Sequence, residues 1–88
     1  MKYNVEKMTS NSGYSVANQF IIRDGDKEIF KSYNSIIAIK ENGTVTLDSY
    51  FWNYSLTTSK YRNIFLGEST KETQAKIKSG EYKLANLN

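Results

Sequence analysis

The chain has 88 residues and a formal net charge of +3, and it contains no cysteine, no histidine and no proline. Without cysteine it has neither a disulfide framework nor a thiolate metal site. Without histidine it lacks the commonest metal ligand and the usual general base near neutral pH. We therefore treat residues 1–88 as one small domain whose core depends on its twelve aromatic residues.

The charge of the chain is unevenly distributed. Residues 1–59 contain six basic and six acidic side chains, whereas residues 60–88 contain six basic and three acidic ones. A basic flank favours nucleic acid or an acidic protein surface, although ordinary solvated helices often have a similar excess. The N-terminus lacks the apolar stretch of a signal peptide, and no apolar run approaches the roughly 18 residues that span a bilayer. We therefore expect a cytoplasmic protein with no membrane partner.

The first half of the chain has the pattern of short strands. Tyr3 and Val5 alternate with polar residues and predict a first strand with one buried face, with Met8 as a further candidate for that face. Residues 9–18 read as a loop, unless Val16 and Ala17 already begin the second strand. Further strands are predicted over residues 19–23, 28–33, 36–40 and 44–47. Asp24-Gly25-Asp26 and Asn42-Gly43 lie between these runs and predict tight hairpin turns.

The pattern changes to that of helices after residue 56. Tyr61, Ile64 and Phe65 have the spacing of one helix face, with Thr57, Thr58 or Ser59 as the cap and Gly67 as the end. Residues 69–72 match a capping box for a second, peripheral helix ending near Gly80, and residues 81–87 alternate as a closing strand would. The fold class predicted is α+β: an antiparallel meander of four to six strands with one or two C-terminal helices packed on it.

Motifs for catalysis, metals and cofactors are weak. Asp24, Asp26 and Glu28 alternate, but they lack the ligand ladder of a calcium loop and are better explained by a hairpin turn. The five glycines are isolated from one another, so no glycine-rich phosphate loop is present. Most acidic residues lie in predicted turns or helix starts, except Asp48, for which a turn or cap role is the simplest reading. We expect no enzyme activity, no metal site and no cofactor.

An aromatic run between the meander and the helices is the leading candidate for a binding surface. In an extended segment Tyr50, Trp52 and Tyr54 would share one face, with Phe51 on the other. Exposed Trp and Tyr are enriched among interface hot spots, so we interpret the three as a protein anchor. The alternative is that all four rings pack under the C-terminal helix or against loops.

Four basic residues in the C-terminal third are candidates for a charged rim or a nucleic-acid surface. They are Lys60, Arg62, Lys76 and Lys78. Basic residues with aromatic platforms are typical of single-strand binders, but Tyr61 is better placed in the core than as a stacking platform. A further possibility is a homo-oligomer formed through an exposed sheet edge.

The block of residues 52–68, together with residues 15–20 and the terminal Leu87-Asn88, resembles a family of small uncharacterised proteins encoded by bacteriophages and prophages. The family has no assigned activity, so no residue role is carried over from it. The resemblance implies a small viral protein acting in the cytoplasm of a host bacterium. We therefore expect a non-catalytic module that binds a host protein, such as an inhibitor of a bacterial defence system of the anti-CRISPR type. Nucleic-acid binding through the basic C-terminal third is the alternative.

Overall fold

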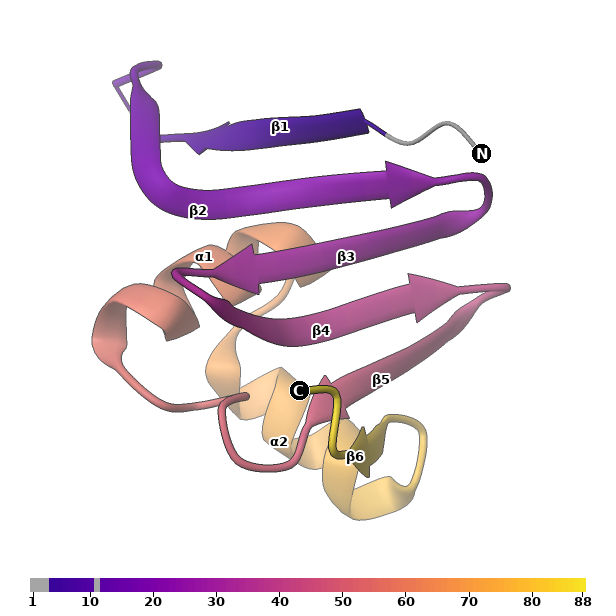
Figure 1. Ribbon diagram of the computed structural model, residues 1–88. Coiled ribbons are helices and arrows are strands. Elements are labelled where there is room, and N and C mark those ends of the chain that lie inside the picture. Colours follow the sequence, from indigo (N-terminus) through magenta and orange to yellow (C-terminus); the bar gives the residue numbers. More distant parts are fainter. Residues whose placement is uncertain (1–3, 11) are drawn as a thin grey trace.

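A computed structural model describes residues 4–10 and 12–88. Six strands form one sheet in which the spatial order follows the sequence order, and two helices lie together on one face of it (Figure 1). The strands are β1 (Asn4–Thr9), β2 (Ser15–Asp24), β3 (Lys27–Ser32), β4 (Ser35–Glu41), β5 (Thr44–Asp48) and β6 (Lys83–Ala85). The helices are α1 (Leu56–Leu66) and α2 (Thr70–Ser79). This architecture is the predicted α+β fold, with a meander followed by two C-terminal helices.

Local turn chemistry sets the register of the meander. Asn42 and Gly43 both have positive φ, 53° and 76°, as a two-residue type I′ hairpin requires. Gly25 has a φ of 62° between β2 and β3, so both predicted hairpin turns are confirmed. The turn between β3 and β4 differs from the prediction in its position, because the sequence pattern places Tyr33 at the end of a strand. Tyr33 lies in the turn between β3 and β4 with a φ of 56°.

The core lies between the sheet and the helices. Its buried apolar side chains are Met8, Phe30, Ile37, Ala38, Leu47, Tyr61, Phe65 and Tyr82. Phe30 and Phe65 stack across the layer boundary with ring centroids 5.7 Å apart, which joins β3 to α1. A bulge in the β3–β4 register places Ile37 next to Ala38 on the covered side, whereas Ile36 pairs with Lys31 on the opposite side.

The helix ends follow the sequence closely, with one correction. Ser55 is the N-cap of α1 and accepts a hydrogen bond from the Thr58 amide, so the expected cap at Thr57, Thr58 or Ser59 is wrong by at least two residues. Gly67 and Gly80 end the two helices in the left-handed conformation, as predicted. The capping box of Ser69 and Glu72 is present in full.

The two ends of the sheet differ from the sequence reading. Met8 is buried but Val5 is more than half exposed, so the expected inward face of β1 is wrong for Val5, and Tyr3 lies outside the described residues. β2 begins at Ser15, which confirms the alternative in which Val16 and Ala17 already belong to that strand. β6 is short and pairs in parallel with β5. The parallel pairing is possible because α1 and α2 form the crossover connection between the two strands.

The bulge in β4 allows a matched test of which sheet face forms the core. Ile37→Ala is expected to lower the free energy of unfolding by about 2–5 kcal/mol, because it leaves a cavity in the packed layer. Ile36→Ala, with the same loss of strand propensity on the opposite face, is expected to cost less than half as much. Urea denaturation followed by far-UV circular dichroism measures both; equal losses would contradict the assignment of the covered face.

Candidate functional site

Asp48 fixes the path of the aromatic run that follows β5. Its buried carboxylate accepts hydrogen bonds from the amides of Tyr50 and Phe51, at 3.1 and 2.7 Å, and from the amide of Leu87 at 2.8 Å. Burial disfavours the charged form, but these backbone donors outweigh it and hold the pKa of Asp48 below its ordinary value. The turn role of Asp48 is therefore confirmed, and its carboxylate is occupied by backbone groups.

Residues 49–55, which we name the junction segment, form turns and not an extended strand. The Trp52 amide donates to the Asp48 carbonyl at 3.1 Å, and the Tyr54 amide donates to the Phe51 carbonyl at 3.2 Å. The expectation that Tyr50, Trp52 and Tyr54 share one face is therefore wrong, because it assumed an alternation with a period of two residues. The turns of the backbone instead bring together the rings of Tyr50, Phe51 and Tyr54. The ring centroids are 4.7 Å apart for Tyr50 and Phe51, 5.3 Å for Phe51 and Tyr54, and 6.1 Å for Tyr50 and Tyr54.

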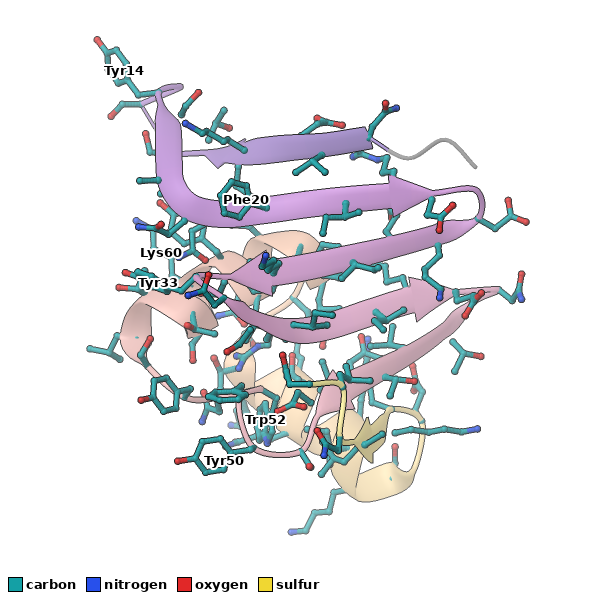
Figure 2. All side chains as sticks on the ribbon, in the orientation of Figure 1. Tyr14, Phe20, Tyr33, Tyr50, Trp52 and Lys60 are labelled. Atoms are coloured by element: carbon teal, nitrogen blue, oxygen red, sulfur yellow. The ribbon has the colours of Figure 1, made fainter. Side chains whose placement is uncertain are left out.

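Trp52 turns away from that cluster and lies against Arg62. The Arg62 guanidinium carbon is 5.2 Å from the centroid of the Trp52 ring, within the range of a cation–π contact. Arg62 Nη1 also donates to the Trp52 carbonyl oxygen at 2.5 Å. Trp52 is half-buried, so its ring is divided between the protein interior and the surface, and Figure 2 labels it below the sheet near Tyr50.

Arg62 is fully buried, with an exposed fraction of 0%. Its guanidinium donates to Asn53 Oδ1 at 3.2 Å, to Asn63 Oδ1 at 2.9 Å and to Thr70 Oγ1 at 2.8 Å. Burial lowers the pKa of Arg62 from its ordinary value, and the nearby negative charge of Glu68 opposes that shift. The assignment of Arg62 to a basic rim or nucleic-acid surface is therefore wrong, because its donors are used to join the junction segment, α1 and the start of α2.

Lys76 belongs to a second polar network at the end of the helices. Its ammonium donates to Glu68 Oε1 at 2.7 Å, and the same carboxylate accepts from the Tyr82 hydroxyl at 2.7 Å and the Thr73 hydroxyl at 2.6 Å. Burial of Glu68 disfavours its charge, but these three donors outweigh burial and hold its pKa below the ordinary value. The contact with Glu68 raises the pKa of Lys76, and burial together with the Glu68 charge raises the pKa of Tyr82. This network stabilises the fold. The contact with Glu68 uses part of the hydrogen-bonding capacity of the Lys76 ammonium.

The structure thus divides the predicted binding residues among three environments. Tyr50 and Tyr54 are 72% and 63% exposed and lie together. Trp52, Arg62 and Lys76 take part in structural contacts. Lys60 and Lys78 are exposed on separate helices, and the Lys60 ammonium lies 5.4 Å from the Tyr61 ring centroid.

A hollow of about 240 Å³ lies beside the exposed tyrosines. The residues that line it are Ser32, Tyr33, Asn34, Ser35, Ile37, Phe51, Tyr54 and Thr58. Tyr33, which is 53% exposed, was missed as a site residue by the sequence reading. Its signal in the sequence is the Tyr33-Asn34 pair between two strand patterns, where a two-residue turn places Tyr33 beyond the end of β3 (Figure 2). We name Tyr33, Tyr50, Phe51 and Tyr54 the aromatic patch.

Metal-ligand clusters and membrane-spanning helices are not found in the described part of the chain. No group of three or more potential metal ligands occurs among the described residues. None of the helices described in the structure is long and apolar enough to cross a membrane. Polar clusters around Asp48, Arg62 and Glu68 are held by internal hydrogen bonds, although Arg62 Nε has no partner among the described residues.

Comparison with known proteins assigns the chain to a family without assigning it an activity. Residues 3–81 match a family model described as "Family of unknown function (DUF8033)". No curated protein and no solved structure matches the chain. The family description gives no activity, so inference about function depends on the geometry given above.

The role of Arg62 can be tested by a change that keeps its charge. Arg62→Lys is expected to lower the free energy of unfolding by about 2 kcal/mol or more, because a single ammonium cannot reach acceptors spread over three elements. Lys60→Ala, on the exposed side of the same helix, is expected to change it by less than about 0.5 kcal/mol. Chemical denaturation followed by the fluorescence of Trp52 provides the measurement. A loss in Arg62→Lys no larger than in the control would contradict this role.

The buried Glu68 carboxylate predicts a loss of stability in acid. Because its pKa is lowered in the folded state, its contribution is fully present above the ordinary glutamate pKa of about 4.3 and is lost as the pH falls through the lowered value. Glu68→Gln is expected to be less stable than wild type at neutral pH and to lose less stability on acidification. Melting temperatures between neutral pH and pH 3 check this, with the exposed Glu81→Gln as control. Parallel profiles for wild type and Glu68→Gln would contradict the prediction.

Proposed function

This chain belongs to the family of unknown function DUF8033, and we propose that it is a non-catalytic protein-binding module. The contact surface in this proposal is the aromatic patch. The observation that carries the proposal is the clustering of two largely exposed tyrosines, Tyr50 and Tyr54, on Phe51 beside a hollow.

The aromatic patch has the composition and rigidity of an interface centre. Tyrosine is enriched among residues that dominate binding energy, because it buries a large area and keeps a polar hydroxyl. The backbone beneath Tyr50 and Phe51 is held by the Asp48 carboxylate. A partner that binds this surface therefore orders little of the chain on binding, which reduces the entropic cost.

The backbone of Tyr33 gives independent support. A φ of 56° is unusual for a bulky residue and is commonly left to glycine. The amide of Tyr33 donates to the carbonyl of Asn18 at 2.6 Å, and Asn18 also has positive φ, at 68°. Tyr33 thus adopts a disfavoured conformation, held by this hydrogen bond, that presents a half-exposed ring at the hollow. Strain of this kind is concentrated at functional sites.

The size and lining of the hollow favour a side chain of a partner protein over a small molecule. Its volume of about 240 Å³ is below the range typical of small-ligand pockets. Ile37 and Phe51 supply apolar surface, whereas Ser32, Ser35 and Thr58 supply hydroxyl groups. A partner that inserts an apolar or aromatic side chain and places backbone polar groups over the hydroxyls would match this lining.

The sequence resemblance to phage and prophage proteins supports a bacterial host protein as the partner. In this proposal the module occupies a surface of that protein and inhibits it, as an inhibitor of a defence system would. Nucleic-acid binding by the C-terminal basic residues has less support, because Arg62 is buried and Lys76 contacts Glu68.

The proposal is tested by removing the exposed rings. Chain immobilised on beads captures proteins from bacterial lysate, and bound proteins are quantified for wild type, for Tyr50→Ser combined with Tyr54→Ser, and for Tyr14→Ser. Tyr14 is the matched control because it is 76% exposed in the loop before β2, away from the patch. We expect one protein to be retained by wild type and control and reduced at least about tenfold in the double variant, as for hot-spot residues. Equal recovery in all three would overturn the patch assignment.

A further inference from the structure

The face of the sheet opposite the helices carries no helix and is apolar at its centre, and at its β4–β5 side Leu87 lies beside Ile39 and Thr46. In Figure 1 both helices lie behind the sheet, and no helix covers the near side. The pairing registers place six apolar side chains on that side, which we name the open face. They are Val5, Phe20, Ile22, Ile29, Ile36 and Ile39.

The registers order the open face into three rows that cross the strands. The central row is Val5, Ile22, Ile29 and Ile39, continued by Thr46. A second row is Lys7, Phe20, Lys31 and Ile36. A third row is Asp24, Lys27, Glu41 and Thr44. An antiparallel sheet with one solvated face normally alternates apolar-in and polar-out, and the central row departs from that rule.

The open face is large for the surface of a monomer. Five strands at a spacing of about 4.8 Å and three rows at about 6.8 Å give a footprint of roughly 24 by 20 Å, or about 480 Å². The footprint includes the charged side chains of the two outer rows, and its area falls within the range of the largest surface patches on ordinary monomers. Two such faces in contact bury about 1,000 Å², which is the lower bound for a specific interface. The area therefore suits a weak, reversible association.

The charges at the two ends of the open face are opposite in sign. The row containing Phe20 has two lysines and no acid, whereas the row containing Lys27 has the two carboxylates Asp24 and Glu41. Among the described residues neither Lys7 nor Lys31 forms an ion pair. The face thus has a basic end, an apolar centre and an acidic end.

We propose that the open face binds the open face of a second copy of this chain. In this dimer the two sheets face each other, and a twofold rotation axis lies between them, parallel to the central row. The rotation places the central row of one copy against the central row of the other. The same rotation reverses the direction of the strands, so the basic end of each copy lies over the acidic end of the other. Two sheets packed in this way, with strands nearly aligned, form the common arrangement of a β-sandwich.

The second copy fits this surface better than other occupants. A nucleic acid would meet Asp24 and Glu41 at one end, and isoleucines offer no ring on which a base can stack. A different protein would need the same apolar centre and the same separation of charges, which the chain itself already provides. No residue of the aromatic patch belongs to the three rows, so this dimer and the proposed function are independent, and the dimer would carry two patches.

The first experiment measures mass against concentration. Sedimentation equilibrium is expected to show a reversible dimer of the 10.1 kDa chain that weakens as salt is raised. Ile29→Thr and, separately, Lys31→Glu are expected to raise the dissociation constant at least tenfold. Ile29→Thr retains a residue with high strand propensity, and Lys31→Glu removes no apolar side chain. Circular dichroism checks the folding of both variants, and either one alone is informative if the other folds poorly. Leu56→Ser is the control, because Leu56 is 92% exposed on the helical side, and it should leave the constant unchanged.

The second experiment tests the twofold axis directly. The chain has no cysteine, so a single Ile29→Cys replacement near the axis is expected to form a disulfide-linked dimer under mild oxidation, because identical positions of the central row meet there. Leu56→Cys under the same conditions is expected to remain largely monomeric.

Several outcomes would overturn the proposal. These are a wild-type chain that stays monomeric at all concentrations, a dimer that persists unchanged in both open-face variants, or equal cross-linking at positions 29 and 56. A monomer that binds a labelled single-stranded oligonucleotide in a salt-dependent manner, and loses binding in Lys31→Glu, would assign the open face to nucleic acid instead.

Discussion

The buried guanidinium of Arg62 is the contact on which the helical layer depends. A small α+β domain has little apolar area with which to fix two short helices and a turn on one sheet face. Arg62 lies where the junction segment, α1 and the start of α2 meet, and its planar donors reach two acceptors on the junction segment and one on each helix. The planar guanidinium can donate hydrogen bonds in three directions, whereas an aliphatic side chain of similar volume would only pack against its neighbours. The charge is tolerated because Trp52 and Glu68 lie near it.

Two further polar contacts tie the C-terminal end of the chain to the sheet. Asp48 joins the end of β5 to the backbone of Leu87, and the side-chain amide of Asn88 exchanges two hydrogen bonds with the backbone of Ile36, at 2.7 and 2.9 Å. Asn88 thus takes the place of a strand residue beside the part of β4 that lies beyond its pairing with β5. The exposed aromatic patch is well positioned at Tyr50 and Phe51 because the Asp48 carboxylate binds their amides.

The parts of this structure that depend on neighbouring residues could be predicted from the sequence. The Asn42-Gly43 turn, the capping box at Ser69 and the helix end at Gly67 each depend on four or five consecutive residues, so local pattern was enough. The burial of Arg62 could not be predicted in the same way. Its acceptors lie up to ten residues away in the sequence, and the backbone and amide oxygens among them are not marked by any sequence pattern. The face shared by the aromatic residues was misjudged for a related reason, because Asp48 converts a stretch rich in strand-forming residues into turns.

The order of the strands has a consequence for how the chain reaches its folded state. β1 to β5 pair with neighbours through tight turns, whereas β6 pairs only after two helices have intervened. Contacts between distant residues form late because of the loop-closure entropy they require. A newly made meander therefore has apolar side chains on both faces until α1 docks on one of them. Until that docking is complete, the exposed apolar side chains favour association with other incompletely folded chains, so the length of this stage sets the exposure of the chain to aggregation.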